Sequence, residues 1–346
     1  MNSIERVSAI LNHQEADRVP VYPLINGVNR KFTNSSYKTW ATDADVCADS
    51  YLKATDELDL DVICTLIDLS VEASDFGQEI IYPENEAAHP NFKNHLLKSS
   101  EEYNKVKYVN PLEAPRMKMH IDLCDKIMKA KGKEKPVVAF VFGPLGILSM
   151  LRGQVDLFTD IYMVPEDIKT AVEEINKTLY EYCDALIETG VHAIMFDTLF
   201  ASQSIMSPEM WMEFEGVFMK PLADYVRSKG CMVMIHNCGH GIYFKEQIEA
   251  MKPVAISFLH VPACCSSFKE TKEKYGKDIT LIGCIPPTDL PRNTKEEVEN
   301  VCKEQIDLFA KDGGFILATG CEYPANLEFD HAKTIVNMAK TYGQYN

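Results

Sequence analysis

The sequence predicts an α/β protein whose fold is a (β/α)8 TIM barrel with an N-terminal helical cap and an insertion before the third strand. Short apolar runs rich in β-branched residues recur along the chain, and each has the pattern of a strand buried on both faces of a parallel sheet. Longer amphipathic stretches separate these runs, as in successive βαβ units. Eight predicted strands result, at residues 19–24, 61–66, 136–142, 192–196, 231–236, 255–260, 279–284 and 315–319.

Three of the intervening stretches carry clear helix signals. Residues 165–188 place apolar side chains at helical spacing. Residues 211–227 follow a Ser-Pro-Glu sequence in which serine is the N-cap and proline takes the first helical position. Residues 293–312 end at two glycines, which commonly follow a helix. Helices are therefore expected to alternate with the strands.

The chain is longer than a plain barrel requires. A (β/α)8 barrel needs about 250 residues, whereas this chain has 346. We place the surplus in the cap, residues 1–18, and in a polar insertion region, residues 68–135, so that residues 1–346 form one domain. An open doubly wound sheet is the alternative fold, but the chain lacks the Gly-x-Gly-x-x-Gly turn of dinucleotide-binding sheets.

Charge and composition exclude several classes of function. The chain has 35 Lys and Arg against 51 Asp and Glu, a formal net charge of −16. Nucleic acids and anionic membranes are bound through Lys and Arg, so neither is expected as a partner. No stretch approaches the roughly 18 apolar residues of a membrane span, and the N-terminus lacks the pattern of a secretory signal. We therefore expect a cytoplasmic protein whose eleven cysteines are mostly reduced or bind metal.

A candidate metal centre lies at the ends of two predicted strands. His236 and Cys238 are two residues apart at the end of one strand, so an extended backbone directs both side chains to one face. Cys321 follows the last predicted strand and reaches the same rim of the barrel. Two thiolates and one imidazole leave the fourth position of a tetrahedral zinc open, as in catalytic zinc sites. A substrate thiol in that position would become a nucleophile at neutral pH. Core packing and a purely structural zinc site are the alternatives for these residues.

Other residues at this rim are further candidates. Asp197 ends the fourth predicted strand, where a carboxylate faces substrate or caps a loop, and it is the candidate catalytic residue. The turn that begins at Gly143 can present backbone N–H groups to an anionic substrate. Arg152 can pair with a carboxylate or sulfonate, or form a surface salt bridge. Glu215 and the neighbouring acidic residues are expected on a solvated helix face. Three more residues are candidates for lining the substrate pocket: His240, His260 and Cys284.

Motifs along nearly the whole chain resemble the uroporphyrinogen decarboxylase superfamily. Its motifs are matched by Glu5-Arg6-Val7, Asp17-Arg18-Val19-Pro20-Val21, Gly143-Pro144-Leu145 and Ile205-Met206-Ser207-Pro208-Glu209. Within the superfamily, the pattern of His236, Cys238 and Cys321 is similar to the His-x-Cys…Cys zinc motif of the methylcobalamin:coenzyme M methyltransferase branch. The resemblance implies a (β/α)8 barrel enzyme that moves a methyl group between a corrinoid and a thiol such as coenzyme M, with Zn²⁺ activating the thiolate. It also implies a small corrinoid protein that brings the methylcobalamin-type cofactor to the barrel mouth.

Two alternative functions are known from other members of the same superfamily. The enzyme would work in the other direction if it demethylated a small substrate and loaded the corrinoid protein. Ether-cleaving members carry a Glu-x14-Glu-x20-His zinc motif, which Glu215 and His236 match in part, but Phe200 stands at the first glutamate. Uroporphyrinogen decarboxylation is less well supported because the arginine-rich N-terminal signature for the substrate's carboxylates is missing after Pro20. The sequence leaves the oligomeric state open.

Overall fold

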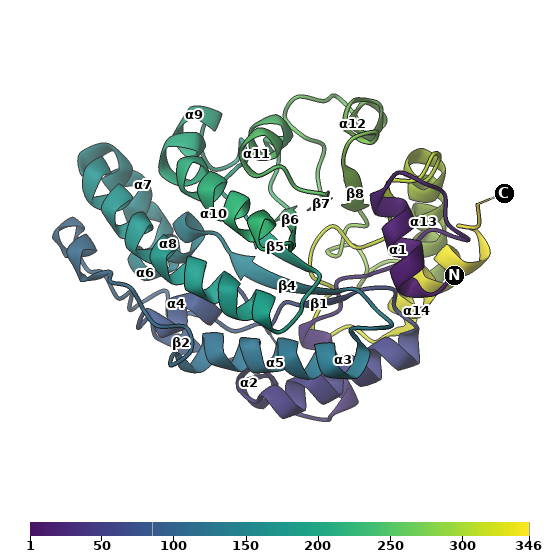
Figure 1. The fold of residues 1–346 in the computed structure, drawn as a ribbon, viewed down its shortest axis with the longest axis horizontal. Helices are drawn as coiled ribbons and strands as arrows, with labels where there is room; N and C mark the ends of the chain where they lie inside the picture. The colour runs from purple at the N-terminus through teal and green to yellow at the C-terminus, as the bar shows by residue number, and fades with distance from the viewer. Residues whose placement is uncertain (85, 346) are drawn as a thin grey trace.

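The computed structural model describes residues 1–84 and 86–345, which contain a curled parallel sheet of seven strands (Figure 1). Each strand pairs with the next one along the sheet in the order β1-β4-β5-β6-β7-β8-β9. The strands are β1 (Ile63–Thr65), β4 (Val137–Phe142), β5 (Ala193–Asp197), β6 (Met232–Asn237), β7 (Ala255–Phe258), β8 (Thr280–Gly283) and β9 (Phe315–Ile316). Each falls within a predicted strand or within one residue of it.

The predicted strand at residues 19–24 is absent, which corrects the expected eight-stranded barrel to a sheet of seven strands. Two prolines in this segment explain the difference, because proline has no N–H group to donate to a ladder. The segment still runs between the two edges of the sheet. Leu317 N, just after β9, donates to Pro20 O at 2.9 Å, and Asp61 N, just before β1, donates to Val21 O at 3.0 Å. Individual backbone hydrogen bonds thus replace a regular ladder at this position.

Helices cover the outer face of the sheet (Figure 1). The predicted helix at 165–188 is α8 (Pro165–Glu188), and the one at 293–312 is α13 (Lys295–Phe309). The predicted helix at 211–227 consists of α9 (Pro208–Trp211), a π-helical turn (Met212–Gly216) and α10 (Val217–Ser228). The helices are α1 (Ser3–Leu11), α2 (Tyr37–Thr42), α3 (Ala44–Leu58), α4 (Val71–Asp75), α5 (Pro115–Lys131), α6 (Pro144–Arg152), α7 (Gln154–Met163), α8 (Pro165–Glu188), α9 (Pro208–Trp211), α10 (Val217–Ser228), α11 (Phe244–Met251), α12 (Phe268–Tyr275), α13 (Lys295–Phe309) and α14 (Asp330–Thr341), with 3-10 helices at Gly27–Phe32 and Ser100–Lys105. Among the described residues, none of these helices is long and apolar enough to span a membrane.

The strands separate two apolar cores. Side chains such as Val138, Met195 and Met234 form an inner core inside the curled sheet, while their neighbours in sequence pack against the helices outside. Val7 and Ile10 of α1 belong to the inner core. The N-terminal helix therefore lies against the amino ends of the strands, at the opposite end from the predicted metal centre.

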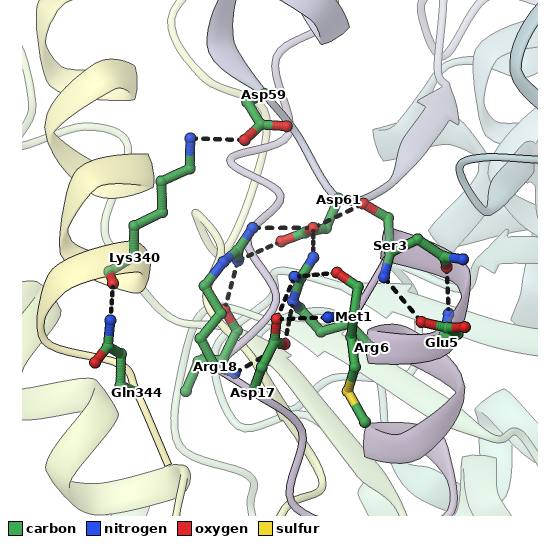
Figure 2. Close-up of polar contacts among 12 residues, drawn as sticks. Met1, Ser3, Glu5, Arg6, Asp17, Arg18, Asp59, Asp61, Lys340 and Gln344 are labelled. Atoms are coloured by element: carbon green, nitrogen blue, oxygen red, sulfur yellow. Dashed lines mark hydrogen bonds and ion pairs between the residues drawn. The ribbon is translucent and has the colours of Figure 1, made fainter. Parts of the chain in front are cut away.

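A buried charge cluster fixes this end of the molecule (Figure 2). The Asp61 carboxylate, which is fully buried, accepts hydrogen bonds from Arg6 Nη1 at 2.8 Å and from Arg18 Nη1 at 2.7 Å. It also accepts from Ser3 Oγ at 2.9 Å and from Val21 N at 2.9 Å. These bonds tie α1 and the segment after it to the start of β1.

The region 68–135 has two parts. Its second part is α5, the helix that connects β1 to β4 on the outside of the sheet. Its first part holds α4 and a two-stranded hairpin of β2 (Ile80–Ile81) and β3 (His89–Pro90). Residues of this first part form one wall of a cavity at the carboxyl ends of the strands.

Candidate metal centre

The three residues of the predicted metal centre come together at the carboxyl rim. One ligand atom from each of His236, Cys238 and Cys321 lies within 4.8 Å of the others. The two Sγ atoms are 3.4 Å apart. A tetrahedral zinc with Zn–S bonds of about 2.3 Å would separate two sulfur ligands by roughly 3.8 Å. The donor set and its spacing therefore fit zinc with one coordination position left open.

His236 is held in place from the neighbouring strand. It lies on β6 in register with Ser257 of β7, and its Nδ1 is 3.0 Å from Ser257 Oγ. This hydrogen bond leaves Nε2 available to a metal, and such bonds orient metal-binding histidines in general. The Phe140 ring packs against the imidazole with 5.9 Å between ring centroids. The ring orientation is thus set before any metal binds.

Close backbone contacts position the two cysteines. Asn237 Oδ1 accepts a hydrogen bond from Gly239 N at 2.9 Å, which bends the chain around Cys238. Gly320 precedes Cys321, and a Cβ atom on it would lie 2.6 Å from Leu259 Cα. Only glycine permits this approach, so the turn that carries Cys321 can pack against the end of β7.

The two thiols have different proton affinities. The hydrogen bond shared by the two sulfurs, followed by the hydrogen bond and charge of His236, lowers the pKa of Cys321. The pKa of Cys238 is raised, first by its hydrogen bond to Cys321 and then by burial. One sulfur is therefore already disposed to be the thiolate that a zinc ion requires.

Asp197 lies beside this trio with an unused hydrogen-bonding atom. It ends β5 in register with His236, and its residue is only 3% exposed. Its Oδ1 is buried without a hydrogen-bond partner. Burial raises the pKa of Asp197 to about 7. Orphaned buried carboxylate oxygens are rare in folded proteins, and one at the mouth of a barrel indicates a place for a ligand.

A cavity of about 410 Å³ lies at the same rim, and its lining residues do not include His236, Cys238, Cys321 or Asp197. It lies over the carboxyl ends of β1, β4 and β5, and Glu322, the residue after Cys321, is part of its wall. The first part of the 68–135 region supplies the outer wall, including His89, Phe92 and His95. The volume is that of a small-molecule site.

The turn at Gly143 and the side chain of Arg152 are occupied by groups of the protein itself. Gly143 N donates to the backbone oxygen of Asp197 at 2.8 Å, and Leu145 N donates to Glu215 Oε1 at 3.2 Å. Arg152 Nε donates to a buried carboxylate, Asp160, at 2.8 Å. Neither feature lines the cavity.

The remaining predicted pocket residues differ in position. His240 and His260 stack on each other at the rim, with their ring centroids 3.6 Å apart. His240 is not part of the group of three potential ligands found in the described chain. Cys284 is buried in the outer apolar core, and burial raises its pKa well above the ordinary value.

Three buried or partly buried carboxyl groups near the rim were not among the predicted site residues. Glu215 was expected on a solvated face but is 1% exposed, and its Oε2 accepts a hydrogen bond from Trp211 Nε1 at 2.8 Å. The π-helical turn around it shifts the helical phase that the periodicity assumed. Glu72 accepts from Phe142 N at 3.0 Å, and burial raises its pKa to about 8. Two of the three had a sequence signal: Glu215 matches part of the Glu-x14-Glu-x20-His zinc motif, and Glu322 directly follows a predicted ligand.

Comparisons with known proteins show the family to which the chain belongs. The uroporphyrinogen decarboxylase (URO-D) family model matches residues 2–342. The chain belongs to the URO-D family. It is 20% identical to the methylcobamide:CoM methyltransferase MtbA of Methanosarcina acetivorans, over 98% of this chain and 97% of that protein. It is 22% identical to a uroporphyrinogen decarboxylase of Helicobacter hepaticus, over 88% of this chain and 87% of that protein.

A solved structure shares the fold over the full length. A methyltransferase from Methanosarcina mazei matches with a TM-score of 0.82 over 99% of both chains, at 20% sequence identity. The resemblance to the URO-D superfamily and its methyltransferases is thus confirmed, and the relatives of this URO-D protein are enzymes.

Proposed function

We propose that this URO-D protein is a zinc-dependent methyltransferase that moves a methyl group between a corrinoid protein and a thiol. The observation that carries the proposal is the convergence of His236, Cys238 and Cys321 within 4.8 Å at the carboxyl rim of the sheet. Zinc held by these residues would lower the pKa of a thiol that completes its coordination, so that the thiol reacts as a thiolate.

The protein's own residues would prepare the transfer. The hydrogen bond from Ser257 fixes His236, and the turns at Gly239 and Gly320 fix the two cysteines. Asp197 Oδ1 is the free acceptor that we assign to the proton of the incoming thiol. His236 is 3% exposed and the two cysteines are partly buried, so little water would surround a sulfur held there and the nucleophile would be poorly solvated.

Exposed apolar side chains support a macromolecular partner at the rim. Phe92, on the cavity wall, is 66% exposed, and Val155 and Tyr162 of α7 are 80% and 74% exposed. Gln154, which begins α7, also lines the cavity. We assign this side of the mouth to docking of the small corrinoid protein, because exposed apolar residues of this kind mark interaction sites.

A metal and activity assay tests the proposal. The purified protein should contain one zinc per chain and should methylate a thiol with methylcobalamin as the donor. Zinc-edge X-ray absorption should show two sulfurs and one nitrogen, with a third sulfur after thiol is added. Full zinc and full activity in both Cys238→Ser and Cys321→Ser would rule out this function. A fourth protein ligand that thiol cannot displace would instead indicate a structural zinc site.

The reverse direction has a separate test. An enzyme that loads the corrinoid protein would form methyl-cobalt from Co(I) corrinoid and a methylated ether, amine or thiol. Uroporphyrinogen decarboxylation is tested by incubating the protein with uroporphyrinogen. We expect no product, because the buried arginines near the mouth are already engaged by other groups of the protein.

A further inference from the structure

We propose that a cavity beneath α1, at the amino end of the sheet, is a ligand site separate from the metal centre, and that it binds a small uncharged molecule with an apolar body and one hydroxyl group. The cavity has a volume of about 350 Å³ and lies between the helix and the first residues of several strands. This inference does not depend on the proposed methyl transfer.

The strands leave this space because their side chains do not fill it. The interior of a (β/α)8 barrel is normally packed by layers of large branched side chains. Here Val138, Ala193 and Met232 are in register on β4, β5 and β6, and all three line the cavity. Ala193, in the middle of this row, supplies only a methyl group. The layer nearest the amino ends is therefore incomplete.

The first helix forms the outer wall of the cavity. Ile4 and Val7 of α1 line it. Between them on the same helix, Arg6 donates a hydrogen bond from Nη1 to the buried Asp61 carboxylate at 2.8 Å (Figure 2). The charge cluster thus fixes this wall as part of the fold, so a ligand would meet a site that is already formed.

The cavity reaches the surface along α1. Ser8 of α1 and Asn12, which follows the helix, are exposed and line the cavity. Met232 and Val254, at the amino ends of two neighbouring strands, are partly exposed and line it as well. A small molecule can therefore enter between the helix and the strands while the core stays folded.

The wall is largely apolar and carries no formal charge. Among the residues that line the cavity there is no aspartate, glutamate, lysine or arginine. His192 is the titratable imidazole of the wall, and burial lowers its pKa, so the ring is neutral at pH 7. A charged ligand would lose its hydration here without gaining an opposite charge. The site therefore favours an uncharged molecule.

Tyr22 supplies a hydrogen-bonding group inside the protein. It lines the cavity and is only 3% exposed, and its phenolic oxygen is buried without a hydrogen-bond partner. Burial, followed by the nearby Cys64 thiol, raises the pKa of Tyr22 well above the ordinary value, so the phenol keeps its proton. Buried hydroxyl groups without a partner are uncommon. A hydroxyl group on a ligand would complete this one.

The volume sets the size of the ligand. An apolar cavity of about 150 Å³ holds benzene, so a cavity of about 350 Å³ takes a molecule roughly twice as large. Sites of this volume, with an apolar wall and a few polar groups, are typical of small-molecule binding. A phenol with a short alkyl chain, such as 4-propylphenol, has the matching size and chemistry.

Isothermal titration calorimetry on the full chain compares three probes. We expect saturable binding of 4-propylphenol at one molecule per chain. Propylbenzene, which lacks the hydroxyl group, should bind about fivefold more weakly, and 4-propylbenzoate, which is charged, about tenfold more weakly or less tightly still. No saturable binding of 4-propylphenol, or binding of either other probe that is as tight, would overturn the inference.

The place of binding is tested at the metal centre. Cys321 does not line this cavity. Cys321→Ser should therefore bind 4-propylphenol as tightly as the parent protein, whether or not the protein is a methyltransferase. Loss of binding in folded Cys321→Ser would place the ligand at the carboxyl rim and would contradict the inference.

A tyrosine pair tests the role of the buried phenol. Tyr22→Phe should weaken binding of 4-propylphenol by about fivefold and leave propylbenzene unchanged. Tyr345→Phe removes another buried phenolic oxygen without a partner, at a residue that does not line the cavity, and should change neither affinity. An unchanged preference for 4-propylphenol in folded Tyr22→Phe would overturn the inference.

A larger side chain should fill the site. Ala193→Leu adds three carbon atoms in the middle of the row of strand residues and should weaken binding of both 4-propylphenol and propylbenzene. Unchanged binding of both by folded Ala193→Leu would contradict the proposed location. If this variant does not fold, Tyr22→Phe decides the question, because it removes a single oxygen atom.

Discussion

The two ends of the sheet both bury polar groups, but they treat them differently. At the amino end, the Asp61 carboxylate is surrounded by donors from Ser3, Arg6 and Arg18 (Figure 2). It also accepts a hydrogen bond from Val21 N. At the carboxyl end, a buried oxygen of Asp197 has no partner, and three side chains that could hold a metal ion converge with no fourth such ligand among the described residues.

The difference separates a structural site from a functional one. A buried charge contributes to one stable fold only when it is fully paired, and an incomplete set of contacts is costly unless a ligand completes it. The motif residues Arg6 and Arg18 therefore belong to the architecture of this URO-D protein, whereas we propose that His236, Cys238 and Cys321 serve its chemistry.

The largest expected effect is at the metal centre. Zinc sites bind with roughly 10–16 kcal/mol shared among their ligands, so the loss of one thiolate should cost on the order of 3–4 kcal/mol, or several hundredfold in affinity. Cys321→Ser should therefore lose zinc and methyl transfer, as measured by metal analysis and by the methylcobalamin assay. Cys264→Ser removes an exposed thiol and should keep both. If Cys321→Ser kept stoichiometric zinc, the carboxyl end of the sheet would no longer differ from the amino end as a functional site.

The next largest effect is expected at the buried charge cluster around Asp61, the structural site of the comparison. Asp61→Asn leaves two buried arginines without their carboxylate, which should lower the free energy of unfolding by about 3–5 kcal/mol. Urea denaturation measures this loss of stability. The zinc content per folded chain should stay unchanged. Asp59 pairs with Lys340 at 2.7 Å but is 56% exposed, so Asp59→Asn should cost less than about 1 kcal/mol. Similar losses for the two variants would mean that the buried cluster has no special role.

A matched pair of serine substitutions sharpens the contrast. Ser257→Ala removes the hydrogen bond to His236 and should weaken zinc binding by about tenfold, as measured by competition with a chelator. Ser3→Ala removes a hydrogen bond to Asp61 and should lower the free energy of unfolding by about 1 kcal/mol without changing zinc affinity. If both variants changed the same property, the two ends would not be functionally separate.

The smallest effect concerns acid stability. The hydrogen bond from Arg6, aided by the N-terminal amine and opposed by burial, holds the pKa of Asp17 well below its usual range. A lowered pKa stabilises the fold above the ordinary carboxyl pKa of about 4, and this contribution is lost as the pH falls through that range and below. As the pH falls from about 5 to about 2, the free energy of unfolding of Asp17→Asn should therefore decrease slightly less than that of the parent protein. Because Asp17 is 40% exposed, the difference should stay below about 1 kcal/mol. Identical pH profiles would show that the outer partner of Arg6 contributes nothing.

Much of the fold and the metal trio could be predicted from local patterns. The apolar runs located seven strands, and the periodicity of residues 165–188 matched the bounds of α8. The pairing of His236 with Cys238 followed from the two-residue repeat of an extended strand. The proximity of Cys321 followed because the carboxyl ends of parallel strands meet at one rim.

The sequence alone therefore predicted the seven strands of the sheet and the three side chains of the candidate metal centre, because alternation and ligand type are local properties of the chain. Tertiary structure alone decided which polar groups are already used. Arg152 and the turn at Gly143 looked available for an anion, but Asp160 and Glu215 occupy them. Hydrogen-bond partners and burial arise from packing between distant segments, so only the folded chain distinguishes a free binding group from one that the protein has already neutralised.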